Sequence, residues 1–113
     1  MDEYKVVISS GKFYKEIILD QKVKRFEVGS SEESDLRINT KNEFCVVLEY
    51  IDDNWTINCD GDVYFLYSGV TKLISKQLNH GDDLLFKTEK EGKELFSLSF
   101  ILNFVFSNKK YDY

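Results

Sequence analysis

The sequence predicts an all-β domain, a sandwich of about ten or eleven mostly antiparallel strands. Along 96–106, large apolar residues fall on even positions: Phe96, Leu98, Phe100, Leu102, Phe104 and Phe106. A period of two places these side chains on one face of an extended strand, although Ile101 and Val105 interrupt the alternation. Elsewhere short apolar runs alternate with turn residues, and no stretch carries apolar residues at helical spacing.

The first half of the chain carries short runs rich in β-branched and aromatic residues, which favour strands. These runs predict strands at 4–8, 13–19, 25–28, 35–38 and 44–50. The residues between the runs are mostly Ser, Gly, Asn and Asp, which favour turns because they bond locally or tolerate unusual backbone angles. The third strand is expected to end at Gly29.

Further strands are predicted in the second half, at 54–58, 63–67, 70–74, 83–87 and 96–106. The turn signals that separate them include Asp52-Asp53, Asp60-Gly61, Ser68-Gly69, Asn79-His80-Gly81 and Glu91-Gly92. Tyr64 and Tyr67 differ in parity, so one of them is expected to face solvent or a partner. If the strand at 96–106 lies uncovered at a sheet edge, we expect it to pair with a second copy and give a dimer.

Length and composition fit one domain with one core. The chain has 113 residues, of which 42% are hydrophobic and 15% aromatic, and it contains no proline. Residues 1–107 are expected to form this single domain, and 108–113 a polar tail that leads into a further domain of a longer protein. The net charge of −5 argues against nucleic acid as a partner, because contacts to phosphate normally dominate such binding.

Neither a membrane span nor a secretion signal is predicted. The longest uninterrupted apolar runs, 44–48 and 63–67, are far shorter than the roughly 20 residues that a spanning helix needs. Cys45 and Cys59 do not make a disulfide framework, and we expect both to be small hydrophobic residues of the core. The domain is therefore expected in the cytoplasm.

The sequence offers little material for catalysis. His80 is the only histidine, and its neighbours Asn79 and Gly81 predict that it lies in a hairpin turn. Acidic pairs such as Asp52-Asp53 fall in predicted turns without the spacing of a calcium loop, and the cysteines lack zinc-ligand spacing. We therefore predict that the domain is not an enzyme and uses neither a metal nor a cofactor.

A series of short motifs indicates a family. A strand ends at Gly29, a polar loop follows, and Asp35 starts the next short strand. Trp55-Thr56-Ile57 comes later, and the turn Gly81-Asp82 precedes an apolar run. This order resembles the forkhead-associated (FHA) domain, a β-sandwich that typically recognises phosphothreonine. The resemblance covers 23–88, and it implies that Gly29, Asp35, Trp55, Gly81 and Asp82 serve the scaffold.

The resemblance also implies that the phosphothreonine site has been lost. FHA domains typically hold the phosphate through an Arg directly after the strand-end Gly, a Ser in a later loop, and an Asn-Gly pair. The corresponding positions here are Ser30, Asn42 and Asp60-Gly61. Within 30–43 the acidic residues outnumber the basic ones, which is the wrong balance for a dianionic phosphate. We therefore expect weak or no binding of phosphothreonine.

The overall pattern further resembles the N-terminal cytosolic FHA-like region of the membrane-anchored FtsK/SpoIIIE-type ATPase of Gram-positive type VII (ESX/WXG100) secretion systems. This resemblance implies a non-catalytic scaffold or regulatory module that binds other components of the secretion machinery. ATP binding and the membrane would then belong to the parent protein. The candidate interaction loops are 30–34, 39–43 and 58–62. Their candidate residues are Ser30, Ser31, Glu32, Glu33, Ser34, Asn39, Thr40, Lys41, Asn42, Glu43, Asp60 and Gly61.

A second hypothesis stays open at this point. The chain is then a phosphopeptide-binding FHA domain with a rebuilt pocket, in which Lys41 and Arg37 supply new donors to the phosphate. Under this hypothesis, replacing Lys41 and Arg37 together with Ala should abolish phosphopeptide binding and leave stability unchanged.

Overall fold

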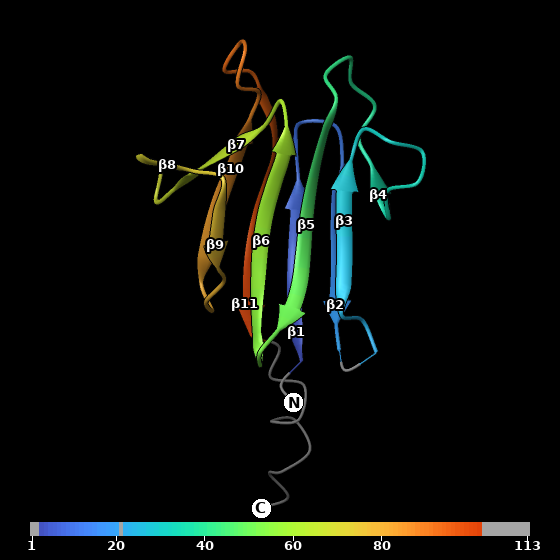
Figure 1. Cartoon of the computed structure of the whole chain (residues 1–113), viewed down its shortest axis with the longest axis vertical. Helices are drawn as coiled ribbons and strands as arrows, with labels where there is room; N and C mark the ends of the chain where they lie inside the picture. The colour runs from blue at the N-terminus through green and yellow to red at the C-terminus, as the bar shows by residue number, and fades with distance from the viewer. Residues whose placement is uncertain (1–2, 21, 103–113) are drawn as a thin grey trace, which may run out of the picture.

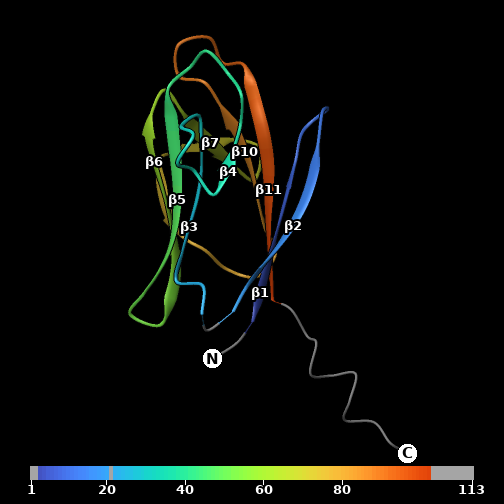
Figure 2. The ribbon, with the colours of Figure 1, turned by 90° about the vertical axis from the view of Figure 1, so that its right-hand side faces the viewer.

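The computed structural model describes residues 3–20 and 22–102, which form two sheets packed face to face (Figure 1). The six-stranded sheet contains, in spatial order, β2 (Tyr14–Leu19), β1 (Tyr4–Ser9), β11 (Glu94–Leu102), β10 (Asp82–Lys87), β7 (Tyr64–Tyr67) and β8 (Thr71–Leu73). The five-stranded sheet contains β4 (Leu36–Arg37), β3 (Arg25–Gly29), β5 (Phe44–Ile51), β6 (Asn54–Gly61) and β9 (Ser75–Gln77). Figure 2 shows the two layers from the side.

Neighbouring strands run antiparallel, with the single exception of the pair β3 and β4. The predicted all-β sandwich of mostly antiparallel strands is therefore confirmed, and each predicted strand has a counterpart. One strand was missed: β9 is short and polar and shows no alternation, and it is held by pairing with β6. The predicted tail at 108–113 and the end of the predicted strand 96–106 lie outside the described residues. No helix in the described part of the chain could cross a membrane.

The described part of the strand at 96–106 does not meet the condition that was set for pairing at a sheet edge. β11 lies inside the six-stranded sheet, where β1 covers one side from Tyr4 opposite Leu102 to Ser9 opposite Ser97, and β10 covers the other. Its backbone groups are therefore already paired, and it cannot serve as the exposed edge on which we based dimerisation. The edges of this sheet are β2 and β8.

Large aromatic side chains fill the space between the sheets. Phe86 and Phe96 stack with ring centroids 4.5 Å apart, and Phe65 packs against Phe86 at 5.4 Å. Phe44 reaches Phe96 from the opposite sheet at 6.3 Å. Fully burying one such side chain contributes about 1.5–3 kcal/mol to the stability of the fold. Burial of these aromatic side chains therefore contributes strongly to holding the two sheets together.

The two cysteines lie on opposite faces of the five-stranded sheet. Cys59 packs against the core, as expected, because it continues the inward row of Trp55 and Ile57 on β6. Cys45 alternates with the buried residues Phe44 and Val46, so its side chain points to the outer face. The prediction that Cys45 belongs to the core was therefore wrong, and both thiols are free.

A β-bulge interrupts the pairing of β10 with β11. Phe86 lies opposite Phe96 and Lys87 opposite Glu94, so Leu95 is an extra residue on β11. Leu95 and Phe96 are consequently both buried, although they are neighbours in a strand. The bulge turns the Leu95 side chain inward at the start of the strand.

An ion pair with little exposure ties the two sheets together near the turn at Gly81-Asp82. Lys76 Nζ on β9 lies 2.7 Å from Asp82 Oδ2 on β10, and the two side chains are 14% and 7% exposed. The same carboxylate oxygen accepts the backbone N–H of Asn79 at 2.8 Å. Lys76 also lies 4.6 Å from the ring centroid of Tyr67. Asp82 thus has the scaffold position that the resemblance implied.

We predict that Lys76→Ala destabilises the domain by about 3 kcal/mol, because it leaves the Asp82 carboxylate without its cation in a mostly buried place. The matched control is Lys72→Ala, which removes an exposed ion pair to Glu89 and should cost at most about 1 kcal/mol. Urea unfolding of both variants measures the difference. Equal losses in the two variants would contradict the structural role given to the Lys76 pair.

Candidate interaction edge

Several connections between strands gather at one end of the sandwich, which we call the loop end (Figure 1). They comprise residues 10–13, 30–35, 38–43, 62–63 and 88–93. The opposite end carries the turn at Asp52 and Asp53, which both have positive φ. Two of the predicted interaction loops, 30–34 and 39–43, lie at the loop end. The third predicted loop, 58–62, is mostly strand, because β6 stays paired with β5 as far as Gly61, which lies opposite Phe44.

Gly29 and Ser30 lie where β3 approaches the start of β5. A Cβ atom at Gly29 would lie 2.8 Å from both the Phe44 carbonyl oxygen and Ser34 Oγ, so only glycine fits. The Ser30 hydroxyl accepts the N–H of Phe44 at 3.1 Å and lies 3.3 Å from its carbonyl oxygen, to which it donates. Ser30 is thus occupied in joining two strands, at the position where the family typically has its phosphate-binding Arg.

Asp35 supports the same corner as a structural residue. Its carboxylate accepts the backbone N–H of Glu27 at 2.9 Å, across the parallel pair of β3 and β4. Ser34 donates its hydroxyl to Glu27 at 3.0 Å, and Arg25 forms an ion pair with the same side chain at 3.0 Å. The hydrogen bond from Arg25, followed by that from Ser34, lowers the pKa of Glu27.

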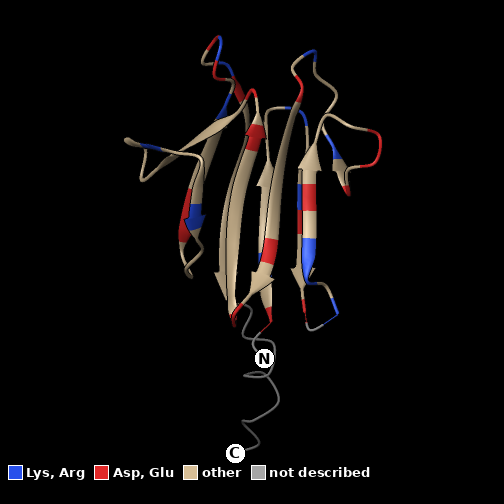
Figure 3. Ribbon diagram, in the orientation of Figure 1, with Lys and Arg blue, Asp and Glu red and all other residues tan. Residues whose placement is uncertain are grey.

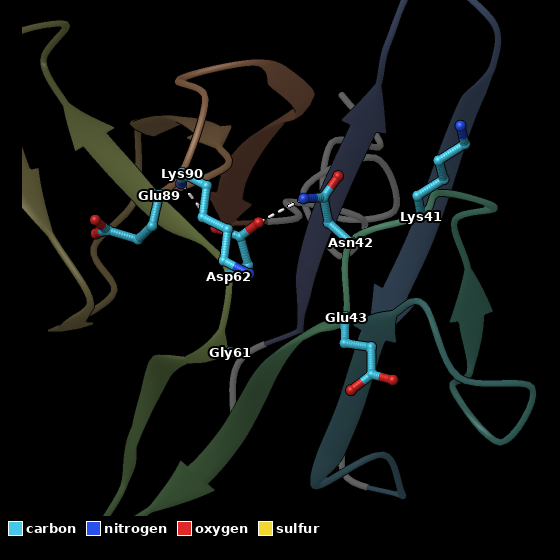
Figure 4. A pocket seen from close by; sticks show the side chains of 7 residues that line it. All are labelled: Lys41, Asn42, Glu43, Gly61, Asp62, Glu89 and Lys90. Atoms are coloured by element: carbon cyan, nitrogen blue, oxygen red, sulfur yellow. Dashed lines mark hydrogen bonds between the residues drawn. The ribbon is translucent and has the colours of Figure 1, made fainter.

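Asn42, which the resemblance aligns with the Ser of FHA domains, is also committed to an internal bond. Its side-chain amide donates to Asp62 Oδ2 at 2.5 Å. The second carboxylate oxygen of Asp62 accepts the backbone N–H of Lys90 at 2.9 Å. The Asp62 N–H in turn donates to the Glu43 carbonyl at 2.9 Å. Asp62 therefore joins three loops of the loop end (Figure 4).

The environment of Asp62 favours its ionised form. Partial desolvation raises its pKa, but the hydrogen bonds from the Lys90 backbone, the Asn42 side chain and the Glu89 backbone together outweigh this effect. The net result is a pKa below the ordinary value of 3.8. A carboxylate anchored in this way places fixed negative charge beside Asn42.

Gly61 allows this arrangement of loops. It has φ of +86°, and a Cβ atom there would lie 2.6 Å from the Glu43 carbonyl oxygen. Both the backbone angle and the close approach therefore exclude a side chain. Gly61 is the part of the predicted Asp60-Gly61 pair that has an evident structural reason.

The positions that correspond to the family's phosphate site come together around two neighbouring hollows. Ser30, Asp60 and Gly61 line one hollow of about 480 Å³. Its remaining described lining residues are Ser31, Glu43, Phe44 and Cys45. Asn42 lines the other hollow, of about 560 Å³, with Lys41, Glu43, Gly61, Asp62, Glu89 and Lys90. The described residues that line the first hollow include no Lys or Arg. Those that line the second include the acidic residues Glu43, Asp62 and Glu89 and the basic residues Lys41 and Lys90.

The thiol in the first hollow is not an acidic one. Burial raises the pKa of Cys45 to about 11, and the nearby carboxylate of Glu27 adds to this effect. Burial likewise raises the pKa of Cys59 to about 12. Reactive cysteines need a lowered pKa, so neither residue has the properties of a nucleophile.

Other residues considered for chemistry also have structural surroundings. His80 Nδ1 accepts the backbone N–H of Leu102 at 2.9 Å, which attaches the turn to the end of β11. Within 3–20 and 22–102, no group of His, Cys, Asp and Glu side chains is arranged to hold a metal ion.

Lys41 and Arg37, the cations of the second hypothesis, line different hollows. Lys41 belongs to the hollow with Asn42 and Asp62, although its side chain points away from Asp62 (Figure 4). Arg37 lines a third depression, together with Lys12 and Lys93. Figure 3 shows basic residues in several connections of the loop end.

Sequence reasoning included Asp62 in the candidate loop 58–62 but missed its hydrogen bond with Lys90. These residues are separated by 28 positions, and the bond involves a backbone N–H, which any residue type supplies. The sequence therefore carries no signal for this contact. The predicted interaction role of the other loop residues stays a prediction.

Comparison with solved structures places this arrangement among known folds. An engineered FHA domain with a Myc-pTBD peptide superposes with a TM-score of 0.62 at 19% identity, covering 95% of this chain and 96% of that chain. The N-terminal FHA domain of Rad53p from S. cerevisiae, in complex with a phosphothreonine peptide, gives 0.61 at 19% identity, covering 93% and 97%. The fold is that of FHA domains.

A third similar structure is the Slr1951 protein from Synechocystis sp., with a TM-score of 0.62, 15% identity, and coverage of 91% of this chain and 98% of that chain. No family model matches the sequence, and no curated protein sequence matches it. The likeness to the FHA domains is therefore one of fold. It confirms the FHA-like sandwich predicted from the spacing of Gly29, Asp35, Trp55 and Gly81-Asp82.

We predict that Asp62→Asn destabilises the domain at neutral pH, because an amide cannot accept hydrogen bonds from two loops as a carboxylate does. A lowered pKa in the folded state contributes stability that is fully present above the unfolded value and is lost as the pH falls through the folded value. The gap in urea midpoint between wild type and Asp62→Asn should therefore be largest at neutral pH and narrow below pH 3.8.

The matched control for this experiment is Asp60→Asn, at an exposed neighbour with no side-chain bond among the described residues. It should leave the midpoint nearly unchanged at both pH values. A constant gap for Asp62→Asn across the pH range would contradict the role of its carboxylate.

Proposed function

We propose that this domain is a non-catalytic protein-interaction module that has given up phosphothreonine recognition. One observation carries the proposal: the donors at the family's phosphate positions are used inside the protein. The Ser30 hydroxyl is bonded to Phe44, and the Asn42 amide is bonded to Asp62. A phosphate placed at either position would have to break these bonds before it could form its own.

Charge supports the same conclusion. Phosphothreonine carries about −1.5 to −2 charges at pH 7, and each hydrogen bond to a charged group contributes about 1.5–3 kcal/mol. The hollow at Ser30 presents the carboxylates of Glu43 and Asp60 and, among its described residues, no cation. A phosphate there would meet like charge without the forked donor that an Arg supplies.

The loop end is the surface that we propose for the partner. Ser31, Glu32 and Glu33 are exposed in the connection that follows β3, and Lys41 and Glu43 are exposed in the connection that precedes β5. Rigid strands on both sides fix these loops, and loops held by a rigid scaffold are common sites of recognition. The surface is mixed in charge and suits a protein partner better than a single anion.

The wider setting of the domain is part of the proposal. We infer that it lies in the cytoplasm, as the N-terminal FHA-like region of a type VII secretion ATPase whose other parts bind ATP and the membrane. This inference rests on the resemblance in sequence pattern. The partner would then be another component of the secretion machinery.

The test is binding to a degenerate phosphothreonine peptide library beside its unphosphorylated twin, at low and high salt. We expect the dissociation constants of the two libraries to agree within about twofold. A tenfold difference would require the site to prefer the phosphorylated peptides by about 1.4 kcal/mol. An FHA domain that binds phosphothreonine serves as the positive control.

Salt-sensitive binding of the phosphorylated library alone would overturn the proposal. Loss of that binding in the double variant Lys41→Ala/Arg37→Ala would then establish the second hypothesis, the rebuilt phosphopeptide pocket. The present arrangement favours the first hypothesis, because these two cations line different hollows.

A further inference from the structure

A cationic groove opens at the loop end beside the hollows described above. It has a volume of about 490 Å³. Its walls are the turn between β1 and β2 at 10–13, the end of β4 with the residues that follow it at 37–40, and residues 93–95 where β11 begins. The groove shares no described lining residue with the two hollows that contain the family's phosphate positions.

The rim of the groove is basic. Lys12, Arg37 and Lys93 each come from a different wall and are exposed, whereas Glu94 is the single acid among the described lining residues. The chain as a whole has a net charge of −5, so this local excess of positive charge opposes the overall balance. Figure 3 shows the basic positions in the connections that form these walls.

These cations are not neutralised within the described part of the protein. The ion pairs found there involve other residues, and the ammonium groups of Lys12 and Lys93 form no hydrogen bond. Arg37 donates its Nε–H to the Ser30 carbonyl at 3.3 Å, which orients the guanidinium and leaves its two NH₂ groups available. Within the described part of the protein, no internal partner therefore competes with a ligand for the ammonium groups of Lys12 and Lys93 or for the NH₂ groups of Arg37.

The floor of the groove is apolar. Phe13 and Ile38 are partly buried and pack against the core, and Leu95 is 9% exposed. The β-bulge at Leu95 turns this side chain to the inside at the start of β11. Asn39 is exposed on the wall with no side-chain hydrogen bond among the described residues, so its amide is available to a peptide backbone.

We propose that this groove binds an acidic peptide segment of a protein partner, with one apolar side chain on the floor and flanking carboxylates on the rim. Cations on three separate walls suit carboxylates spaced along a peptide, and an apolar floor gives no advantage to a free inorganic anion. The proposal goes beyond the loss of phosphothreonine binding and depends on the proposed function only in taking a protein as the partner.

The probe for the test is a short fluorescein-labelled peptide in which glutamates flank a central leucine. Its two matched controls carry glutamine in place of glutamate, or serine in place of leucine. Fluorescence anisotropy at low and high salt should show salt-sensitive binding of the first peptide, because the Debye length falls from about 10 Å at 0.1 M to about 3 Å at 1 M salt. Both control peptides should bind more weakly.

Two triple variants of equal charge change locate the binding. The groove variant is Lys12→Gln/Arg37→Gln/Lys93→Gln. The control variant is Lys22→Gln/Lys24→Gln/Lys72→Gln. All of these side chains are exposed, and thermal unfolding checks that both proteins remain folded. We expect the groove variant to weaken binding at least about tenfold and the control variant less than about twofold.

Equal weakening in the two variants would overturn the proposal, because it would show attraction to net charge without a site. Absence of any preference for the glutamate peptide over its glutamine twin would also overturn it. A phosphothreonine peptide that competes with the probe and depends on Ser30 or Asn42 would refute the proposed function instead, so the two failures are distinguishable.

Discussion

Asp62 holds three connections of the loop end together. Its carboxylate accepts hydrogen bonds from the Asn42 side chain and the Lys90 backbone, and its N–H donates to the Glu43 carbonyl. The connections of β4 with β5, β6 with β7, and β10 with β11 thereby take fixed positions. This contact also uses the Asn42 amide and sets a negative charge at a position that the resemblance in sequence aligns with the phosphate site of FHA domains. The same interaction thus fixes the loops of the loop end and leaves the Asn42 amide unable to bind a phosphate without breaking this bond.

The sandwich below this end is a rigid support with two different surfaces above it. On the side of Ser30 the hollow carries carboxylates and exposed serine, and on the side of Arg37 the groove carries cations over an apolar floor. The connection 38–43 divides them, since Asn39 and Thr40 line the groove while Asn42 and Glu43 line the hollows. A protein partner that spans this connection would contact both surfaces at once.

Much of the fold could be predicted because it depends on local patterns. Alternation along the strands, turn residues between them, and the Gly29, Asp35 and Gly81-Asp82 spacing were enough to give the FHA-like sandwich. The strand β9 was missed because Ser75, Lys76 and Gln77 have no alternation, and its place depends on the pairing with β6 and on the Lys76 contact with Asp82.

The site was predicted only in part, for a physical reason. The positions Ser30, Asn42 and Gly61 line neighbouring hollows, as the resemblance to FHA domains implied. The contacts that decide their chemistry join residues far apart in the chain, such as Asp62 with Lys90, and include backbone groups that leave no trace in sequence. Lys12, Arg37 and Lys93 likewise share one groove only because the turn after β1, the end of β4 and the start of β11 lie together at the loop end. The exposure of Cys45 follows from strand parity and was open to prediction.

We propose that the edge where Ser30, Asn42 and Gly61 meet does not bind phosphate. The most direct measurement is an NMR titration of the ¹⁵N-labelled protein with phosphothreonine peptide, followed at the backbone amides of Ser30, Phe44 and Gly61 and at the Asn42 side chain. We expect the chemical shifts of these signals to stay unchanged up to millimolar concentrations of the peptide. Saturable shifts at these amides, absent with the unphosphorylated peptide, would contradict it.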